Sequence, residues 1–105
     1  MTLFNKIISR EIPATIIYED DKFIAFNDIN PINPGHFLVV PKVFSENLMD
    51  IDDLTLSELI ILSNKLAKKV TKDMNINGYQ LHINNGIESG QEVMHTHIHI
   101  IPSKK

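Results

Sequence analysis

The chain has 105 residues, of which 43% are hydrophobic and 22% charged, and it contains no cysteine. This composition predicts a single globular domain over residues 1–105 with one modest core. A formal net charge of −3, without a cluster of lysine and arginine, excludes a protein that coats nucleic acid. No stretch approaches the ~20 apolar residues that cross a bilayer. The lack of cysteine suits a reducing cytoplasm, where we expect the protein to be located.

The first quarter of the sequence predicts a short helix followed by a β-hairpin. Apolar residues recur at helical spacing over Leu3–Ile8, directly after Thr2, a candidate N-cap. Residues 16–18 and 23–26 are rich in β-branched and aromatic side chains, as strands are. The polar residues 19–22 between them predict a tight connection, so the two strands should pair.

A loop, a third strand and a long helix follow. Residues 28–35 contain two prolines and a glycine, which favour a loop, and His36–Val40 then resumes a strand that Pro41 ends. The clearest helix is predicted to begin at Thr55, because Thr55–Glu58 has the pattern of a capping box. Its apolar residues recur every three or four positions as far as residue 74, and residues 75–78 should end it.

The remaining sequence predicts two more strands, over Tyr79–Asn84 and Val93–Ile101. Strands and helices do not alternate regularly, as they would in a parallel sheet. We therefore predict an α+β domain with a mainly antiparallel sheet.

The last predicted strand carries three histidines at alternate positions, His95, His97 and His99. Side chains on a strand alternate between its two faces, so this spacing predicts three imidazoles on one surface. A single histidine there would indicate only a solvated face. Three of the chain's five histidines in one register indicate a chemical site, because imidazole can act as nucleophile, acid, base or metal ligand near neutral pH.

Metal binding and phosphate chemistry are the two alternatives for this strand. Histidines at i and i+4 on a strand lie about 13 Å apart, so three of them converge poorly on one zinc ion, although Asp28, His36 or Glu92 could add ligands. A neutral imidazole between two others suits nucleophilic attack on phosphorus. The preceding loop, residues 84–91, has two glycines that would let backbone amides approach an anion, although an Asn-Gly turn needs no ligand.

The chain closely resembles the histidine triad (HIT) family and, within it, the Hint-like nucleoside phosphoramidases. The family motif of three histidines separated by apolar residues stands here as His95–Ile101, with Thr96 as a polar departure. Other landmarks follow in family order: residues 4–8, 12–14, 19–21, 26–31 and 35–42, together with Asn84-Asn85-Gly86 and Gly90-Gln91.

The resemblance implies a fold and a set of partners. It implies a five-stranded antiparallel sheet with one long and one or two short helices, usually paired in a homodimer whose sheets join into one. It also implies a purine nucleoside monophosphate, or its phosphoramidate, bound beside the histidine strand. The resemblance implies that the protein requires no cofactor. Bound zinc is kept as an alternative, because imidazole is a common zinc ligand.

The resemblance also implies a role for each site residue. His97 would attack the α-phosphorus and form a nucleotidyl-histidine, His99 would contact the phosphate and the bridging atom, and His95 and His36 would form a proton network behind the nucleophile. Asp28 would accept hydrogen bonds from the ribose, unless it caps the next turn. The nucleotide-binding residues would be Phe4, Ile7, Ile24, Phe26, Asp28, Ile29, Asn84, Gln91 and Val93.

Three functions therefore remain open. The first is a hydrolase that cleaves the P–N bond of purine nucleoside 5'-monophosphoramidates, and the second is a hydrolase of dinucleoside polyphosphates. The third is a purine nucleotide-binding or scaffold module without useful turnover. Glu92 favours the third, because many Hint-like proteins have a serine there that assists the leaving group, whereas a carboxylate would repel phosphate unless it turned away. His82 matches no site residue of the family, and we expect it to be exposed or at an interface.

Overall fold

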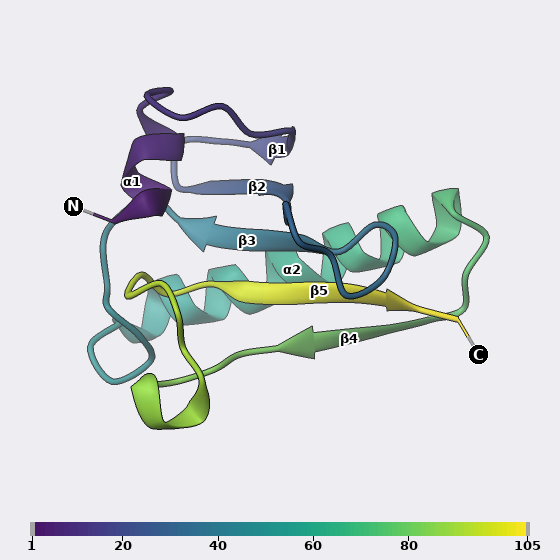
Figure 1. Cartoon of the computed structure of the whole chain (residues 1–105). Helices are drawn as coiled ribbons and strands as arrows, with labels where there is room; N and C mark the ends of the chain where they lie inside the picture. The colour runs from purple at the N-terminus through teal and green to yellow at the C-terminus, as the bar shows by residue number, and fades with distance from the viewer. Residues whose placement is uncertain (1, 105) are drawn as a thin grey trace.

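A computed structural model describes residues 2–104, so Met1 and Lys105, the ends of the predicted domain, lie outside the described residues. Five antiparallel strands form one sheet in the order β1-β2-β3-β5-β4 (Figure 1). The predicted α+β fold is confirmed. The elements are α1 (Leu3–Ile8), β1 (Ile16–Glu19), β2 (Phe23–Asn27), β3 (Phe37–Pro41), α2 (Asp53–Asp73), β4 (Gly78–His82), a single 3-10 turn (Ile87–Ser89) and β5 (Ile98–Ser103).

Each face of the sheet packs against one helix. Phe37, Val39, Ile98 and Ile100 point to the α2 side and form a core with the apolar stripe of that helix. The alternate residues of β2 and β3 point to the other side, where Phe4 and Ile7 of α1 cover them. Because successive side chains of a strand alternate, β3 is buried on both faces. The short helix α1 covers only part of its face, and this leaves room beside it for a site.

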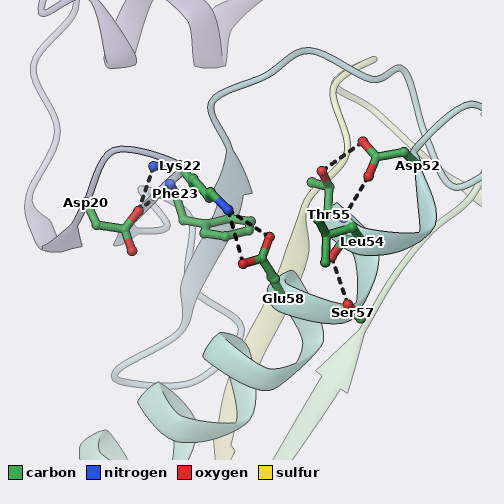
Figure 2. A network of polar contacts seen from close by, with 8 residues as sticks. All are labelled: Asp20, Lys22, Phe23, Asp52, Leu54, Thr55, Ser57 and Glu58. Carbon is green, nitrogen blue, oxygen red and sulfur yellow. Dashed lines mark hydrogen bonds and ion pairs between the residues drawn. The ribbon is translucent and has the colours of Figure 1, made fainter.

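The β1–β2 hairpin forms as predicted, and an aspartate closes its turn. The Asp20 carboxylate accepts hydrogen bonds from the backbone N–H groups of Lys22 and Phe23, both at 2.7 Å (Figure 2). The Lys22 ammonium then reaches Glu58 on α2 at 3.2 Å. The turn is therefore held both locally and against the helix.

The predicted start of α2 at Thr55 is wrong. The helix begins at Asp53, with Asp52 as its N-cap, and the Asp52 carboxylate accepts from both the backbone N–H and the hydroxyl of Thr55, each at 2.8 Å (Figure 2). An aspartate three residues earlier is an equally good cap, and it leaves Thr55 as the capped residue. Glu58 pairs with Lys22 instead of completing a capping box.

The predicted strand over Val93–Ile101 is wrong at both ends, because β5 runs from Ile98 to Ser103. The His95 N–H donates to the Val93 carbonyl at 2.9 Å, and the Thr96 N–H donates to the Ser45 carbonyl at 2.8 Å. Amides used in this way cannot join the ladder with β3. Two of the three histidines of the motif therefore lie in an irregular segment before the strand.

The third strand also begins one residue later than predicted, at Phe37, and β4 ends at His82 rather than at Asn84. Within residues 2–104, no helix combines the length and the apolarity needed to span a membrane.

Candidate active site

A cavity of about 300 Å³ lies between α1 and the sheet. Its apolar lining comes from side chains of α1, β2 and β3, including Phe4, Phe26 and Leu38, and its polar lining includes Asp28, His97 and His99. Among the residues predicted to bind nucleotide, the cavity is lined by Phe4, Ile7, Phe26, Asp28, Ile29 and Val93.

Three other predicted nucleotide-binding residues do not line the cavity. Ile24 is fully buried in the core beneath α1. The Asn84 amide donates to the Ser89 carbonyl at 2.7 Å, and the Gln91 amide nitrogen donates to the carbonyls of Glu46 and Val93 at 2.7 and 3.0 Å. Both side chains therefore shape the loop that precedes the histidines.

The two glycines of that loop have a conformational role. Gly86 and Gly90 adopt φ values of +92° and +95°, a region that other residues rarely occupy. The Gly86 N–H donates to the Gln91 side-chain oxygen at 2.8 Å. The turn accounts for both glycines, so they are not by themselves evidence of the predicted anion cradle.

One ring nitrogen of His97 makes a hydrogen bond, and the other has no partner among residues 2–104. Its Nδ1 lies 2.6 Å from the carbonyl oxygen of His95, which can only accept, so Nδ1 carries the proton and Nε2 holds a lone pair. Burial lowers the pKa of His97 and keeps the ring neutral at pH 7. Phe4 packs edge-on against it, with ring centroids 4.9 Å apart. The result is an oriented, unprotonated nitrogen on a residue that lines the cavity.

His95 lies behind His97 and is fully buried. Its Nε2 donates to the Pro41 carbonyl at 2.9 Å, so Nδ1 is the acceptor, and it lies 3.1 Å from the hydroxyl of Thr2. Burial lowers the pKa of this ring as well. Thr2 is also the N-cap of α1, where its hydroxyl accepts from the Asn5 N–H at 3.3 Å. The helix that covers the cavity is thus joined to the histidine segment.

His36 and His99 form a second hydrogen-bonded pair. The backbone N–H of Ile32 donates to Nδ1 of His36 at 3.0 Å, so the His36 proton must be on Nε2. Nε2 donates to Nδ1 of His99 at 2.9 Å, which leaves the His99 proton on its own Nε2. His36 was predicted to lie behind the nucleophile with His95, but the structure places it against His99.

The His99 ring is neutral at pH 7 in this arrangement. Burial, and then the neighbouring rings of His97 and His36, lower its pKa to about 4. Its side chain is 21% exposed, on the cavity side of the sheet. His99 therefore presents one N–H donor to a ligand in the cavity.

Asp28 lies beside this pair and makes two kinds of polar contact. One carboxylate oxygen accepts from the Asn30 N–H at 2.8 Å, as an aspartate that caps a turn does. The other lies 3.5 Å from Nε2 of His36 and 3.9 Å from Nδ1 of His99. Its negative charge raises the pKa of both rings and so partly offsets the effect of burial.

Three site contacts have no recognisable signal in the sequence. Ser45 is buried and bonds Thr96 through their hydroxyls at 2.6 Å, which explains the polar residue within the motif. The Ile32 amide fixes the proton position of His36, and the Thr2 hydroxyl contacts the second ring nitrogen of His95. Glu92, in contrast, was flagged by the sequence, and it lies exposed on the lining of the cavity.

Residues 9–105 match the sequence model of the HIT domain family. The chain belongs to the HIT family. An uncharacterized 13.1 kDa HIT-like protein of Mesomycoplasma hyorhinis is 52% identical over 103 residues, which cover 98% of this chain and 93% of that protein. The family resemblance predicted from the motif is therefore confirmed.

Solved structures of HIT proteins share the fold. A Hit-like protein of Bartonella henselae, described as involved in cell-cycle regulation and crystallised with an unknown ligand, has a TM-score of 0.95 at 45% identity, covering 99% of this chain and 81% of its own. A HIT family hydrolase of Clostridium thermocellum has a TM-score of 0.84 at 41% identity, covering 97% and 90%.

The donor atoms of Asp28, His36 and His99 lie within 4.8 Å of one another, as ligands of a metal ion could. A zinc-bound histidine triad family protein of Mycobacterium smegmatis has a TM-score of 0.94 at 32% identity, covering 98% of this chain and 75% of its own. A zinc-bound histidine almost always donates its second ring N–H to an acceptor. The second nitrogen of His36 faces the Ile32 N–H donor, so His36 does not fit this role.

Proposed function

We propose that this HIT protein hydrolyses purine nucleoside 5'-monophosphoramidates through a nucleotidyl intermediate on His97. The observation that carries the proposal is the free Nε2 lone pair of His97. A carbonyl 2.6 Å from Nδ1 holds the ring in this tautomer, on a residue that lines a partly apolar cavity. Phosphorus is an electrophile that suits such a nitrogen.

The cavity fits a nucleotide by the chemistry of its lining. Phe4, Ile7 and Phe26 offer apolar and aromatic surface for a purine base. Asp28 and His99 belong to the same lining and would meet the ribose and the phosphate. In this arrangement the α-phosphorus lies in front of His97 and His99, within reach of both rings, whose centroids are 4.9 Å apart.

The first chemical step transfers the nucleotidyl group to the protein. Nε2 of His97 forms a bond to the α-phosphorus while the P–N bond breaks and the amine leaves with a proton. The negative charge of the bound phosphate, together with Asp28, favours protonated His99. We propose that His99 takes up a proton when the substrate binds and gives a proton from Nε2 to the leaving amine. In protonated His99 the additional N–H is on Nδ1, and Asp28 is the nearest acceptor for it.

The second step returns the protein to its initial state. Water attacks the phosphorus of the nucleotidyl-histidine and gives a proton to His99, which is neutral after the first step. The P–N bond to His97 breaks, the nucleoside monophosphate leaves, and His99 releases its additional proton to the solvent, because its pKa in the free site is about 4. Nδ1 of His97 keeps its proton in both steps, because the His95 carbonyl remains its acceptor.

The test is AMP release from adenosine 5'-phosphoramidate, combined with mass spectrometry of protein quenched during turnover. We expect turnover and a protein adduct of one AMP, and His97→Ala should lose both. Turnover retained in His97→Ala would sink the proposal. Tight AMP binding by the wild-type protein without turnover or adduct would favour the non-catalytic module, and faster cleavage of diadenosine triphosphate would favour the dinucleoside polyphosphate hydrolase.

We also propose a homodimer that continues the sheet through β4. Within the described part of the chain this strand pairs with β5 alone, so one of its edges is open to pairing. Leu81, on the α2 side of β4, is 37% exposed, and Ile61 of α2 is 56% exposed. Light scattering coupled to size exclusion measures the mass directly. A monomer at micromolar concentration would refute the dimer without bearing on the chemistry.

A further inference from the structure

The connection between β3 and α2 packs behind the segment that carries the nucleophile. Residues 93–97 of this segment precede β5 and belong to no strand. The Pro41 carbonyl, at the start of the connection, accepts from the His95 ring at 2.9 Å. Four residues further along, Ser45 contacts Thr96, the residue between His95 and the nucleophile. The irregular segment is therefore held at two successive residues from the same side.

Ser45 and Thr96 form a closed set of hydrogen bonds. The backbone N–H and the hydroxyl of Thr96 both donate to the Ser45 carbonyl, at 2.8 and 3.2 Å. The two hydroxyl oxygens lie 2.6 Å apart. Because the Thr96 hydroxyl proton is directed at the carbonyl, the Ser45 hydroxyl is the donor within this pair. Both residues are buried, so a lost contact would not be replaced cheaply by water.

The peptide group between His95 and Thr96 joins these contacts to the nucleophile. A trans peptide group is planar, so its N–H and its C=O point in opposite directions. The N–H of this group is that of Thr96, and it donates to Ser45. The C=O is that of His95, and it accepts from Nδ1 of His97 at 2.6 Å. Fixing one side of the plane therefore fixes the direction of the other.

We propose that Ser45 and Thr96 are positioning residues that hold the His95 carbonyl against Nδ1 of His97. This inference rests on the proposed function of His97 as the nucleophile. In a paired strand the ladder would fix this peptide, but β5 begins only at Ile98. The two residues take the place of the ladder. A carbonyl turned away from Nδ1 would free the ring to carry its proton on Nε2, which removes the lone pair that attacks phosphorus.

The test is Thr96→Val, which replaces the hydroxyl by a methyl group of similar size and leaves the Ser45 hydroxyl without its acceptor. We expect kcat for adenosine 5'-phosphoramidate to fall about tenfold, as a small misplacement of a reacting group does, with KM within twofold of wild type. In ¹H NMR spectra, the Nδ1–H resonance of His97 should move upfield as its short hydrogen bond lengthens. Thr96→Ser keeps the hydroxyl and should restore both values.

Thr71→Val is the matched control. Thr71 is buried on α2, and its hydroxyl donates to the Ala67 carbonyl at 2.7 Å. Both valine variants should lower the urea midpoint, because each loses a buried hydrogen bond. Only Thr96→Val should change kcat and the His97 resonance. An equal fall of kcat in the two variants would assign the effect to stability and overturn the proposal. An unchanged kcat or an unchanged resonance in Thr96→Val would also overturn it.

The two proposals can fail separately, because the resonance is measured without a substrate. If the wild-type protein does not cleave the phosphoramidate, the phosphoramidase function fails, and the His97 resonance alone carries the test. If Thr96→Val does not fold, Ser45→Ala replaces it. That variant also removes the hydroxyl pair but keeps the main-chain acceptor for Thr96, so the same changes should be smaller. A resonance that moves in the folded variant supports the positioning role, and an unchanged one refutes it.

Discussion

The backbone N–H of Ile32 donates to Nδ1 of His36 at 3.0 Å, and this contact determines the protonation of two histidines. A ring nitrogen that accepts a hydrogen bond cannot also carry a proton. The His36 proton is therefore on Nε2, and His99, which accepts it at 2.9 Å, carries its own proton on Nε2. A main-chain group thereby determines which His99 nitrogen carries the proton.

Together with two carbonyl contacts, this relationship predicts the tautomers of four histidines. We expect Nε2–H for His36, His95 and His99 and Nδ1–H for His97, because each partner atom is fixed as a donor or acceptor. Long-range ¹⁵N–¹H NMR spectra at pH 7.5 distinguish the two forms. A His97 ring protonated on Nε2 would contradict the assignment and remove the nucleophile.

The same contact predicts that zinc does not support activity. Zinc on Nε2 of His36 would put the ring proton on Nδ1, against the Ile32 N–H donor. Protein purified without a histidine tag and treated with a chelator should keep its full phosphoramidase rate. Loss of activity on chelation, with recovery on addition of zinc, is the outcome that would contradict this prediction.

The lowered pKa values of the site histidines predict that stability falls with acid. The pKa of His99 is about 4 in the folded protein, against an ordinary value of 6.5, so between these values the unfolded chain binds more protons. The free energy of unfolding should be highest above pH 6.5 and fall by about 3 kcal/mol towards pH 4 from this group alone. Burial acts in the same direction on His36, His95 and His97.

Urea unfolding at pH 7.5, 6, 5 and 4.5 measures this dependence. The variant His99→Gln should show a smaller fall than the wild-type protein, because its side chain does not titrate. Equal slopes for the two proteins would show that His99 does not have the lowered pKa.

Ser63→Ala should stabilise the protein by about 1 kcal/mol. Ser63 is fully buried on α2, and its hydroxyl has no hydrogen-bond partner among the described residues. Removing a buried hydroxyl that lacks a partner relieves a desolvation cost, and alanine is also the better helix former. The urea midpoint should rise at constant m. The control is Ser57→Ala, since this exposed helix residue bonds the Leu54 carbonyl at 2.8 Å and should gain little.

Asp52→Ala should destabilise the protein by about 1 kcal/mol. Asp52 caps α2 through the Thr55 N–H, a contact whose loss typically costs this amount. Asp52→Asn keeps an acceptor and should retain most of the stability. If Thr55→Ala cost more than Asp52→Ala in urea unfolding, the cap predicted from the sequence would be the correct one after all.

Much of the fold could be predicted because it follows from side-chain periodicity. The hairpin and the apolar face of α2 follow from apolar spacing and polar turns, and the antiparallel sheet from their order. The start of α2 could not be chosen, because Asp52 and Thr55 are both good caps. The start of β5 could not be predicted either. The alternation of His95, His97 and His99 extends beyond the paired strand, and periodicity does not show that the Thr96 N–H donates to the Ser45 carbonyl.

The candidate site also has a part that could be predicted from the sequence and a part that could not. Residue types at family positions identified the histidines and the apolar lining, which side-chain chemistry specifies. The proton positions could not be predicted, because they depend on main-chain atoms of Ile32, Pro41 and His95. Any residue type supplies those atoms, so only the folded geometry shows where they point.

The six-residue length of α1 has a consequence for how the protein responds to its ligand. Isolated helices shorter than about 12 residues are marginal in water, so α1 depends on Phe4 and Ile7 packing beneath it and on Thr2 meeting His95. A base in the cavity would add a packing surface for these same side chains. Nucleotide occupancy should therefore protect the N-terminal segment from proteases and slow its amide exchange, because a ligand that binds the ordered form stabilises it by mass action.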